Sequence, residues 1–94
     1  MQQANGSEGI VMYSGSSCYY CVRARDLLDR KGVPYREIKV DVSAELRVEM
    51  ERRSRRRTIP QIFINGLHVG GFDDIAALDR VGELEPLLEP VRQG

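Results

Sequence analysis

The sequence predicts an α/β fold in which a mixed four-stranded β-sheet is flanked by helices. Three observations lead to this prediction. A short apolar strand pattern precedes an amphipathic helix, a second strand pattern follows that helix, and an apolar hairpin surrounds Asn65-Gly66. A strand–helix–strand start implies a parallel pair joined by a right-handed crossover, whereas an Asn-Gly turn joins antiparallel strands. The predicted order is β-α-β-α-β-β-α, with a short C-terminal helix.

The first half of the chain alternates between strands and helices. Residues 10–13 form a short apolar run that the loop sequence SGSS ends, which predicts a buried strand. A helix is predicted over residues 19–31, because apolar residues recur there at helical spacing and Gly32 is suited to ending it. Apolar residues over 35–42 predict a second strand, and Ser43 can cap a second helix.

The second half contains a hairpin and two further helices. Asn-Gly is a strong turn signal between apolar runs, and Asp73 or Asp74 can cap the next helix. Gly82 ends that helix, and a short final helix is predicted before Pro90. The predicted segments are strands at 62–64 and 67–69 and helices at 73–81 and 84–88.

Length and composition limit the classes of protein to consider. The 94 residues suffice for one small domain, and 41% apolar with 30% charged residues argue against wholesale disorder. The polar residues 1–8 are predicted to be a flexible tail, and 9–94 a single domain. A net charge of zero gives no global basis for binding nucleic acid or an anionic membrane. Without a signal peptide or a transmembrane-length apolar run, a reducing cytoplasm is the predicted location.

The two cysteines of the chain, Cys18 and Cys21, enclose Tyr19 and Tyr20. Such a pair can bind a metal, close a small structural disulfide or exchange disulfides with another molecule. A zinc site usually needs four ligands, and the chain adds one histidine, His68, within an apolar hairpin. A structural disulfide across so short a loop stabilises little. A CxxC that follows a strand and opens a helix in a βαβ unit therefore favours thiol–disulfide exchange.

Position on the helix gives the two thiols different roles. Cys18 would lie at the helix N-terminus, where free backbone N–H groups and the helix dipole lower the pKa of a thiol. Cys21 lies one turn further on and is more covered, so Cys18 is the predicted attacking thiol and Cys21 the resolving thiol. Because the nucleophilicity of a thiolate falls together with its pKa, a lowered pKa does little for the rate of attack. Its larger effect is that Cys18 becomes a good leaving group in a mixed disulfide.

Three motifs, taken in order, resemble the glutaredoxin family, most closely its small bacterial dithiol class. They are SCYYC at 17–21, TIPQIFING at 58–66 and GGFDD at 70–74, and the resemblance extends from Gly9 to Leu88. It implies a thioredoxin-like fold and a monomeric enzyme of electron transport and cell redox homeostasis. Glutathione would be the cosubstrate, and protein–glutathione mixed disulfides and protein disulfides the substrates. No metal or prosthetic group would be required.

The resemblance also implies a glutathione site. Ile59, which the following proline favours in an extended conformation, could offer its N–H and C=O to an extended peptide, and Pro60 is expected to be cis. Gly70-Gly71 allow close approach of the backbone, and the next helix offers N–H groups to a carboxylate and an aspartate to an ammonium. The implied glutathione-binding residues are Tyr20, Arg56, Thr58, Ile59, Pro60, Gly71, Asp73 and Asp74.

One departure from the family pattern leaves alternative functions open. Tyr19 replaces the proline of CPYC, which removes rigidity at the start of the helix and adds a backbone donor. In related proteins, loss of that proline is associated with a two-iron, two-sulfur cluster held between two subunits with glutathione. A glutathione-ligated iron–sulfur cluster dimer is therefore one alternative function, and a redoxin reduced by thioredoxin reductase is another.

A second departure is the absence of the lysine that the family often carries shortly before the first cysteine. Gly15 and Ser16 occupy those positions. Arg56 or Arg57, from the basic run at 52–57, is the expected substitute contact for the glycine carboxylate of glutathione. Most arginines of this run are expected to solvate the helix end and to favour its dipole. The run is local and has no interleaved aromatic residues, so it does not indicate nucleic-acid binding.

Overall fold

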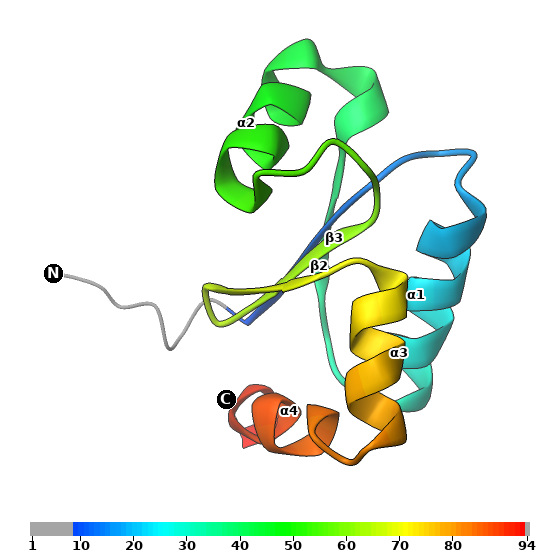
Figure 1. The fold of residues 1–94 in the computed structure, drawn as a ribbon, viewed down its shortest axis with the longest axis vertical. Helices are drawn as coiled ribbons and strands as arrows, with labels where there is room; N and C mark the ends of the chain where they lie inside the picture. The colour runs from blue at the N-terminus through cyan, green and yellow to red at the C-terminus, as the bar shows by residue number, and fades with distance from the viewer. Residues whose placement is uncertain (1–8, 94) are drawn as a thin grey trace, which may run out of the picture.

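The structure, a computed structural model, describes residues 9–93 of the chain (Figure 1). The predicted flexible tail at 1–8 lies outside the described residues. The elements are β1 (Ile10–Ser14), α1 (Tyr19–Arg30), β2 (Arg36–Lys39), the 3₁₀ helix η2 (Val40–Val42), α2 (Ala44–Ser54), β3 (Gln61–Ile64), β4 (Leu67–Gly70), α3 (Phe72–Arg80) and α4 (Leu84–Gln93). No helix within the described range is both long and apolar enough to cross a membrane.

The four strands form one mixed sheet in the order β2-β1-β3-β4, which confirms the predicted fold class. β1 pairs in parallel with β2, with Val11 opposite Arg36, and antiparallel with β3, with Val11 opposite Phe63. β3 and β4 form the predicted hairpin, in which Asn65 and Gly66 have positive φ values of 49° and 85°. Both central residues of a type I′ turn need positive φ, so this dipeptide suits the connection.

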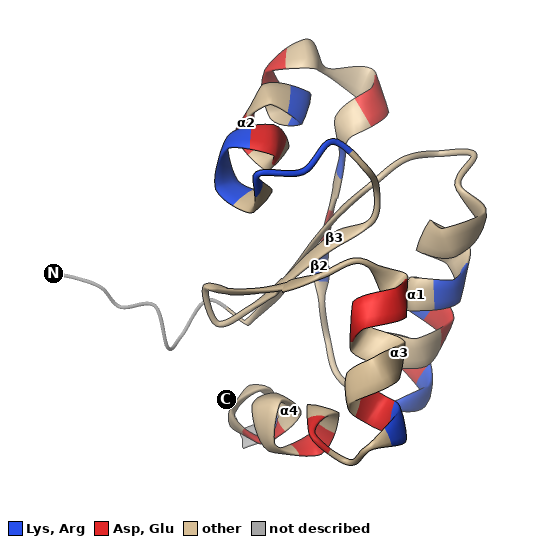
Figure 2. Ribbon diagram, viewed as in Figure 1, with Lys and Arg blue, Asp and Glu red and all other residues tan. Residues whose placement is uncertain are grey.

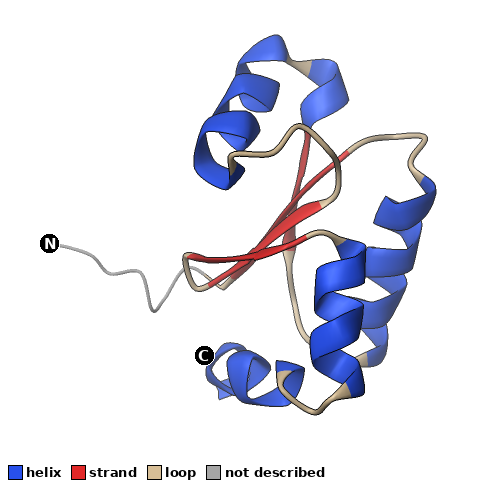
Figure 3. Cartoon of the chain, in the orientation of Figure 1, coloured by secondary structure: helices blue, strands red, loops and turns tan. Residues whose placement is uncertain are grey.

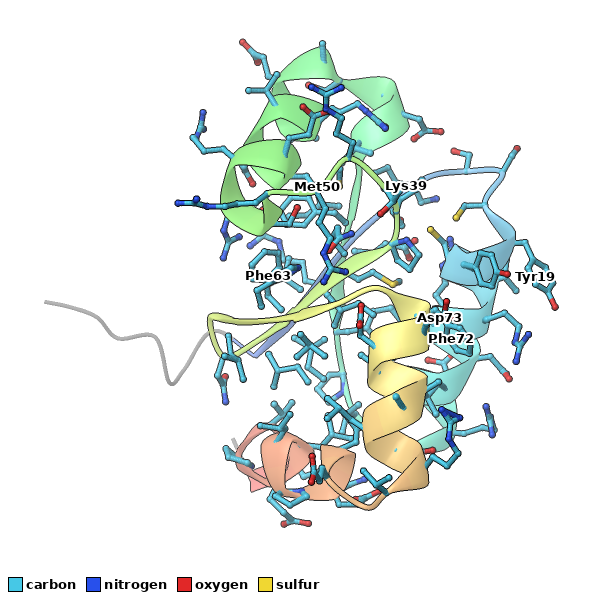
Figure 4. All side chains as sticks on the ribbon, in the orientation of Figure 1. Tyr19, Lys39, Met50, Phe63, Phe72 and Asp73 are labelled. Carbon is cyan, nitrogen blue, oxygen red and sulfur yellow. The ribbon has the colours of Figure 1, made fainter. Side chains whose placement is uncertain are left out.

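Helices cover both faces of the sheet. α1, α3 and α4 lie on one face and α2 on the other (Figure 1 and Figure 3). Successive residues of a strand point to opposite faces, so Met12 joins the core beside α1 whereas Tyr13 joins the core beneath α2. Met50 of α2 and Phe63 of β3 belong to this second core (Figure 4). The larger core consists of Ile10, Met12, Ala24, Leu27, Leu28, Val33, Ile62, Ile64, Ile75, Leu84 and Leu88.

The second strand is shorter than the sequence predicted. β2 ends at Lys39, and the next three residues form η2. Val40 is buried, whereas Val42 is 74% exposed. Of the two valines that predicted a strand through residue 42, only Val40 is therefore buried, and the two do not form a continuous apolar strand face.

The prediction that Asp73 or Asp74 caps the third helix was wrong by two or three residues. α3 begins at Phe72 and its N-cap is Gly71, so both aspartates lie in the first turn. The Asp74 carboxylate accepts a hydrogen bond from the N–H of Gly71 at 2.8 Å. A carboxylate at the third helical position can satisfy the N-cap N–H. Asp74 therefore stabilises the start of the helix from within its first turn.

The last helix is longer than predicted. α4 continues through Pro90 to Gln93 instead of ending before the proline. Proline cannot donate the hydrogen bond that a helix needs at this position. Val91, which follows it, is partly buried against the larger core, which favours continuation of the helix.

Candidate active site

Cys18 is the N-cap residue of α1. Its Sγ accepts a hydrogen bond from the N–H of Cys21, with an N···S distance of 3.2 Å. The first N–H groups of a helix have no partners within the helix, and an anionic sulfur is suited to accept from them. Cys18 is partly exposed and Cys21 is buried, so Cys18 is the thiol that an incoming molecule can reach.

The two thiols lie in different environments, although both are free. Burial, and next the hydrogen bond with Cys18, raise the pKa of Cys21 to about 12. Cys21 therefore keeps its proton at neutral pH, which is compatible with the predicted role of a resolving thiol. The described residues contain no group of three or more His, Cys, Asp or Glu side chains placed to hold a metal ion.

The raised pKa of Cys21 predicts selective alkylation. We expect iodoacetamide to label the wild-type protein once, at Cys18. In the Cys18→Ser variant, Cys21 should react at pH 8 at least about tenfold more slowly than free cysteine, because burial, the largest cause of its raised pKa, remains. The rate should continue to rise above pH 9, since the thiolate fraction grows until the pH reaches the pKa.

Mass spectrometry of timed samples measures this labelling. The same variant unfolded in urea is the control, and it should react at the rate of free cysteine. A labelling rate of folded Cys18→Ser that levels off near pH 9 would contradict the assignment, because that is the behaviour of an exposed thiol.

A groove with a volume of about 280 Å³ lies between the first turns of α1 and α3 and the loop before β3. All eight residues that the resemblance implied for glutathione line this groove, together with Phe72. They are Tyr20 from α1, Arg56, Thr58, Ile59 and Pro60 from the loop, and Gly71, Asp73 and Asp74 from the start of α3. The fold thus brings three separate sequence motifs to one place.

Ile59 connects the groove to the attacking thiol. The Ile59–Pro60 peptide bond is cis, as the resemblance implied. The carbonyl oxygen of Ile59 lies 3.8 Å from Cys18 Sγ, and its N–H has no hydrogen-bond partner within residues 9–93. A Cβ at Gly15 would lie 2.7 Å from Ile59 Cδ1. A larger residue at position 15 would therefore require the end of the Ile59 side chain to shift.

An ion pair spans the groove. Arg56 Nη1, from the loop, lies 2.9 Å from Asp74 Oδ2 of α3. The N–H of Gly71, and next the Arg56 guanidinium, hold the pKa of Asp74 below its ordinary value. Asp73 is exposed and has no ion-pair partner in the described part of the chain. Of the two arginines that the sequence left open as a carboxylate contact, Arg56 lines the groove and Arg57 does not.

Gln61 has a role that the sequence analysis missed. Its side chain is fully buried, and its Nε2 donates to the carbonyl oxygen and to Oγ1 of Thr58, at 3.0 and 3.2 Å. Its Oε1 accepts from His68 Nε2 at 2.8 Å. Burial lowers the pKa of His68, so this imidazole is neutral at pH 7. The amide ties Thr58 to β4, and no local sequence pattern indicates these contacts.

Side-chain contacts order the two tyrosines between the cysteines. Arg23 Nη1 donates to the Tyr19 hydroxyl at 3.0 Å, and its guanidinium carbon lies 4.8 Å from the Phe72 ring centroid. Tyr20 stacks on Phe72 with 6.2 Å between centroids. Figure 4 shows Tyr19 on the first turn of α1 and Phe72 with Asp73 at the start of α3. Arg23 therefore contacts side chains of both helices, Tyr19 of α1 and Phe72 of α3. Tyr19 occupies the position of the proline in CPYC.

A protein with this sheet and with two thiols arranged for exchange at one helix N-terminus is a thiol–disulfide oxidoreductase of the thioredoxin-like class. Comparison with known sequences narrows the class. A family model described as Glutaredoxin matches residues 10–69. The chain belongs to the glutaredoxin family.

Individual relatives agree with this assignment. The chain is 49% identical over 79 residues to a glutaredoxin of Pseudomonas aeruginosa, covering 84% of this chain and 94% of that protein. It is 49% identical over 80 residues to glutaredoxin 3 of Escherichia coli, covering 85% and 96%. The crystal structure of a buckwheat glutaredoxin–glutathione complex superposes with a TM-score of 0.81 at 32% identity, covering 92% of this chain and 81% of that one.

Proposed function

We propose that the protein is a glutathione-dependent oxidoreductase that reduces protein–glutathione mixed disulfides and protein disulfides. The observation that carries the proposal is the groove beside Cys18, which gathers groups complementary to both ends of glutathione and is lined by Ile59, whose carbonyl oxygen lies 3.8 Å from Cys18 Sγ. The buckwheat relative, solved as a complex with glutathione, supports the same ligand. Action as a cytoplasmic monomer without a bound metal belongs to the proposal.

Glutathione is a short extended peptide with charged groups at its ends. Its γ-glutamyl carboxylate would accept from the N–H groups of the first turn of α3, and its ammonium would pair with Asp73. Its central backbone would pair with the N–H and C=O of Ile59, as an added strand does. Arg56 would turn from Asp74 to the glycine carboxylate, so binding would exchange one ion pair for another.

The proposed reaction consists of two exchanges at the Cys18 sulfur. The Cys18 thiolate attacks the glutathione sulfur of a mixed disulfide, the S–S bond breaks, and the protein thiolate leaves with the bonding electrons. Cys18 is then glutathionylated. A second glutathione thiolate attacks the glutathione sulfur of that intermediate, Cys18 leaves as the thiolate, and oxidised glutathione departs. Each step consumes one thiolate and releases another, so charge and electrons balance.

Protein disulfides would require Cys21. Cys18 attacks one sulfur of the substrate and releases the other as a thiolate. Cys21 then attacks the Cys18 sulfur, its proton passes to the departing substrate thiolate, and a Cys18–Cys21 disulfide forms. Two glutathione molecules reopen this disulfide, with oxidised glutathione as the product.

Turnover of a small glutathione mixed disulfide with two reductant systems tests the proposal. We expect activity with glutathione and glutathione reductase, and none with thioredoxin reductase as the only source of electrons. Asp73→Asn should raise KM for the glutathione mixed disulfide about tenfold with kcat nearly unchanged. Hydrogen bonds to charged groups contribute roughly 1.5–3 kcal/mol to binding, and this one would be lost equally in the ground state and the transition state.

Asp26→Asn is the matched control for Asp73→Asn, since Asp26 is exposed on α1 and pairs with Arg30 away from the groove. It should leave KM unchanged. Activity with thioredoxin reductase alone would overturn the glutathione dependence. A visible absorption band and a dimer after anaerobic purification would favour an iron–sulfur carrier instead.

A further inference from the structure

Residues 52–57, at the end of α2 and in the loop that follows, contain five arginines and no acidic residue. Two of these arginines have partners within the fold. The Arg53 guanidinium lies 4.3 Å from the Phe63 ring centroid, and Arg56 pairs with Asp74. The other three side chains are exposed and have no ion-pair partner among residues 9–93. These three, Arg52, Arg55 and Arg57, are called the basic patch below.

Arg55 occupies a position that stability alone would give to glycine. It is the C-cap of α2, with φ 59° and ψ 25°, in the left-handed region. Helices often end with a residue in this conformation, and it is usually glycine because a Cβ destabilises left-handed backbone. The exposed side chain of Arg55 gains no packing in return. A cation at a helix C-terminus favours the helix dipole, but this does not require the left-handed residue itself to be the arginine, and the charges of the basic patch remain available to a bound partner.

One member of the basic patch, Arg57, lies close to the attacking sulfur along the chain. It is two residues before Ile59, whose carbonyl oxygen lies 3.8 Å from Cys18 Sγ. Two residues of extended chain span at most about 7 Å, and charges act over a screening length of about 8 Å at physiological salt. Arg55 is two residues further away along the chain, so an acidic segment that extends from a substrate cysteine at Cys18 would meet Arg57 first and Arg55 next.

The basic patch lies outside the groove proposed for glutathione, since none of its three arginines lines that groove. Figure 2 shows basic residues gathered at the end of α2 and along the following loop, whereas the first turn of α3 is acidic. Charge is therefore distributed unevenly over these elements, although the net charge of the whole chain is zero.

We propose that the basic patch is a docking surface for acidic segments that flank the reacting cysteine of a protein substrate. This inference rests on the proposed function and adds to it a substrate class. Electrostatic steering of this kind raises association rates at low salt by about tenfold or more.

Two glutathionylated peptides of equal length test the inference, one with aspartates and one with lysines on both sides of its cysteine. The wild-type kcat/KM should be about tenfold higher for the acidic peptide at low salt, and the ratio should approach one in high salt. Arg55→Glu/Arg57→Glu should bring the ratio below one and leave turnover of a small glutathione–cysteine disulfide unchanged, since neither arginine lines the groove. Arg36→Glu/Arg80→Glu, an exposed pair with the same charge change, should behave as wild type.

Arg55→Gly separates a docking role from a structural one. It should lower the acidic preference while leaving Tm unchanged or higher, since glycine suits the left-handed C-cap. A lower Tm together with an unchanged preference would show that Arg55 serves the fold. Equal kcat/KM for both peptides at low salt, or an equal effect of both double variants, would overturn the docking surface.

A glutathione-free reaction keeps this test independent of the proposed function. Cys18 in the Cys21→Ser variant attacks a peptide–thionitrobenzoate disulfide, the peptide sulfur joins Cys18, and coloured thionitrobenzoate leaves with the electron pair. The acidic peptide should react faster by a similar factor. If wild type fails to turn over the small glutathione disulfide, the proposed function fails. The docking proposal is then decided by the thionitrobenzoate release rates of the acidic and basic peptides alone.

Discussion

Replacing Cys18 by serine should lower kcat/KM for a small glutathione mixed disulfide by at least about 1,000-fold, because the partly exposed thiol is lost and the remaining one, Cys21, is buried. Replacing Cys21 by serine should leave this activity within about threefold of wild type. Cys21 is buried and keeps its proton, since burial raises its pKa to about 12. A route in which glutathione itself regenerates Cys18 does not need the second thiol.

The coupled assay with glutathione reductase measures both variants, and a protein disulfide substrate gives the contrast. Reduction of the protein disulfide should fall sharply in Cys21→Ser, because no thiol remains to resolve the intermediate at Cys18. Activity of Cys18→Ser with the small substrate would contradict the assignment of the nucleophile. Loss of that activity in Cys21→Ser would instead make the Cys18–Cys21 disulfide obligatory.

Gly70→Ala should lower the free energy of unfolding by about 3 kcal/mol or more. Gly70 is buried with φ 124°, a conformation that side chains rarely adopt, and a new Cβ would collide with the Asp74 carboxylate. That carboxylate cannot move freely, because the N–H of Gly71 and the Arg56 guanidinium both hold it. The substitution therefore combines backbone strain with disruption of the groove.

Gly82→Ala is the matched control for this effect. Gly82 also has positive φ, at 80°, but a Cβ there would meet nothing within 4 Å. We expect it to cost about 1 kcal/mol, from the left-handed backbone alone. Urea denaturation at equal m-values measures both variants, and equal losses would show that the contact with Asp74 contributes nothing.

The location of the groove could be predicted from the sequence because its residues lie in short motifs. Cys18 follows a strand and opens a helix, so its position at a helix N-terminus follows from local pattern alone. The Asn65-Gly66 turn likewise fixes the hairpin that places Gly71 opposite the Pro60 loop.

Contacts between distant side chains could not be predicted in this way. Gln61 directly precedes the strand predicted at 62–64, and only the folded chain shows that its amide joins Thr58 to His68. The predicted end of the second strand was wrong for a related reason. A valine at position 42 fits a strand by propensity, but tertiary packing turns the chain one residue after Lys39.

The contact between Arg23 and Tyr19 makes one side chain depend on another. A proline at position 19 would restrict the backbone by itself, whereas tyrosine is ordered through a partner four residues later on the same helix face and through the Tyr20 ring, 5.3 Å away between centroids. We therefore expect substitutions at positions 19 and 23 to be non-additive. A return from CYYC to CPYC would make Arg23 dispensable for order beside the nucleophile, because the proline restricts the backbone without a partner.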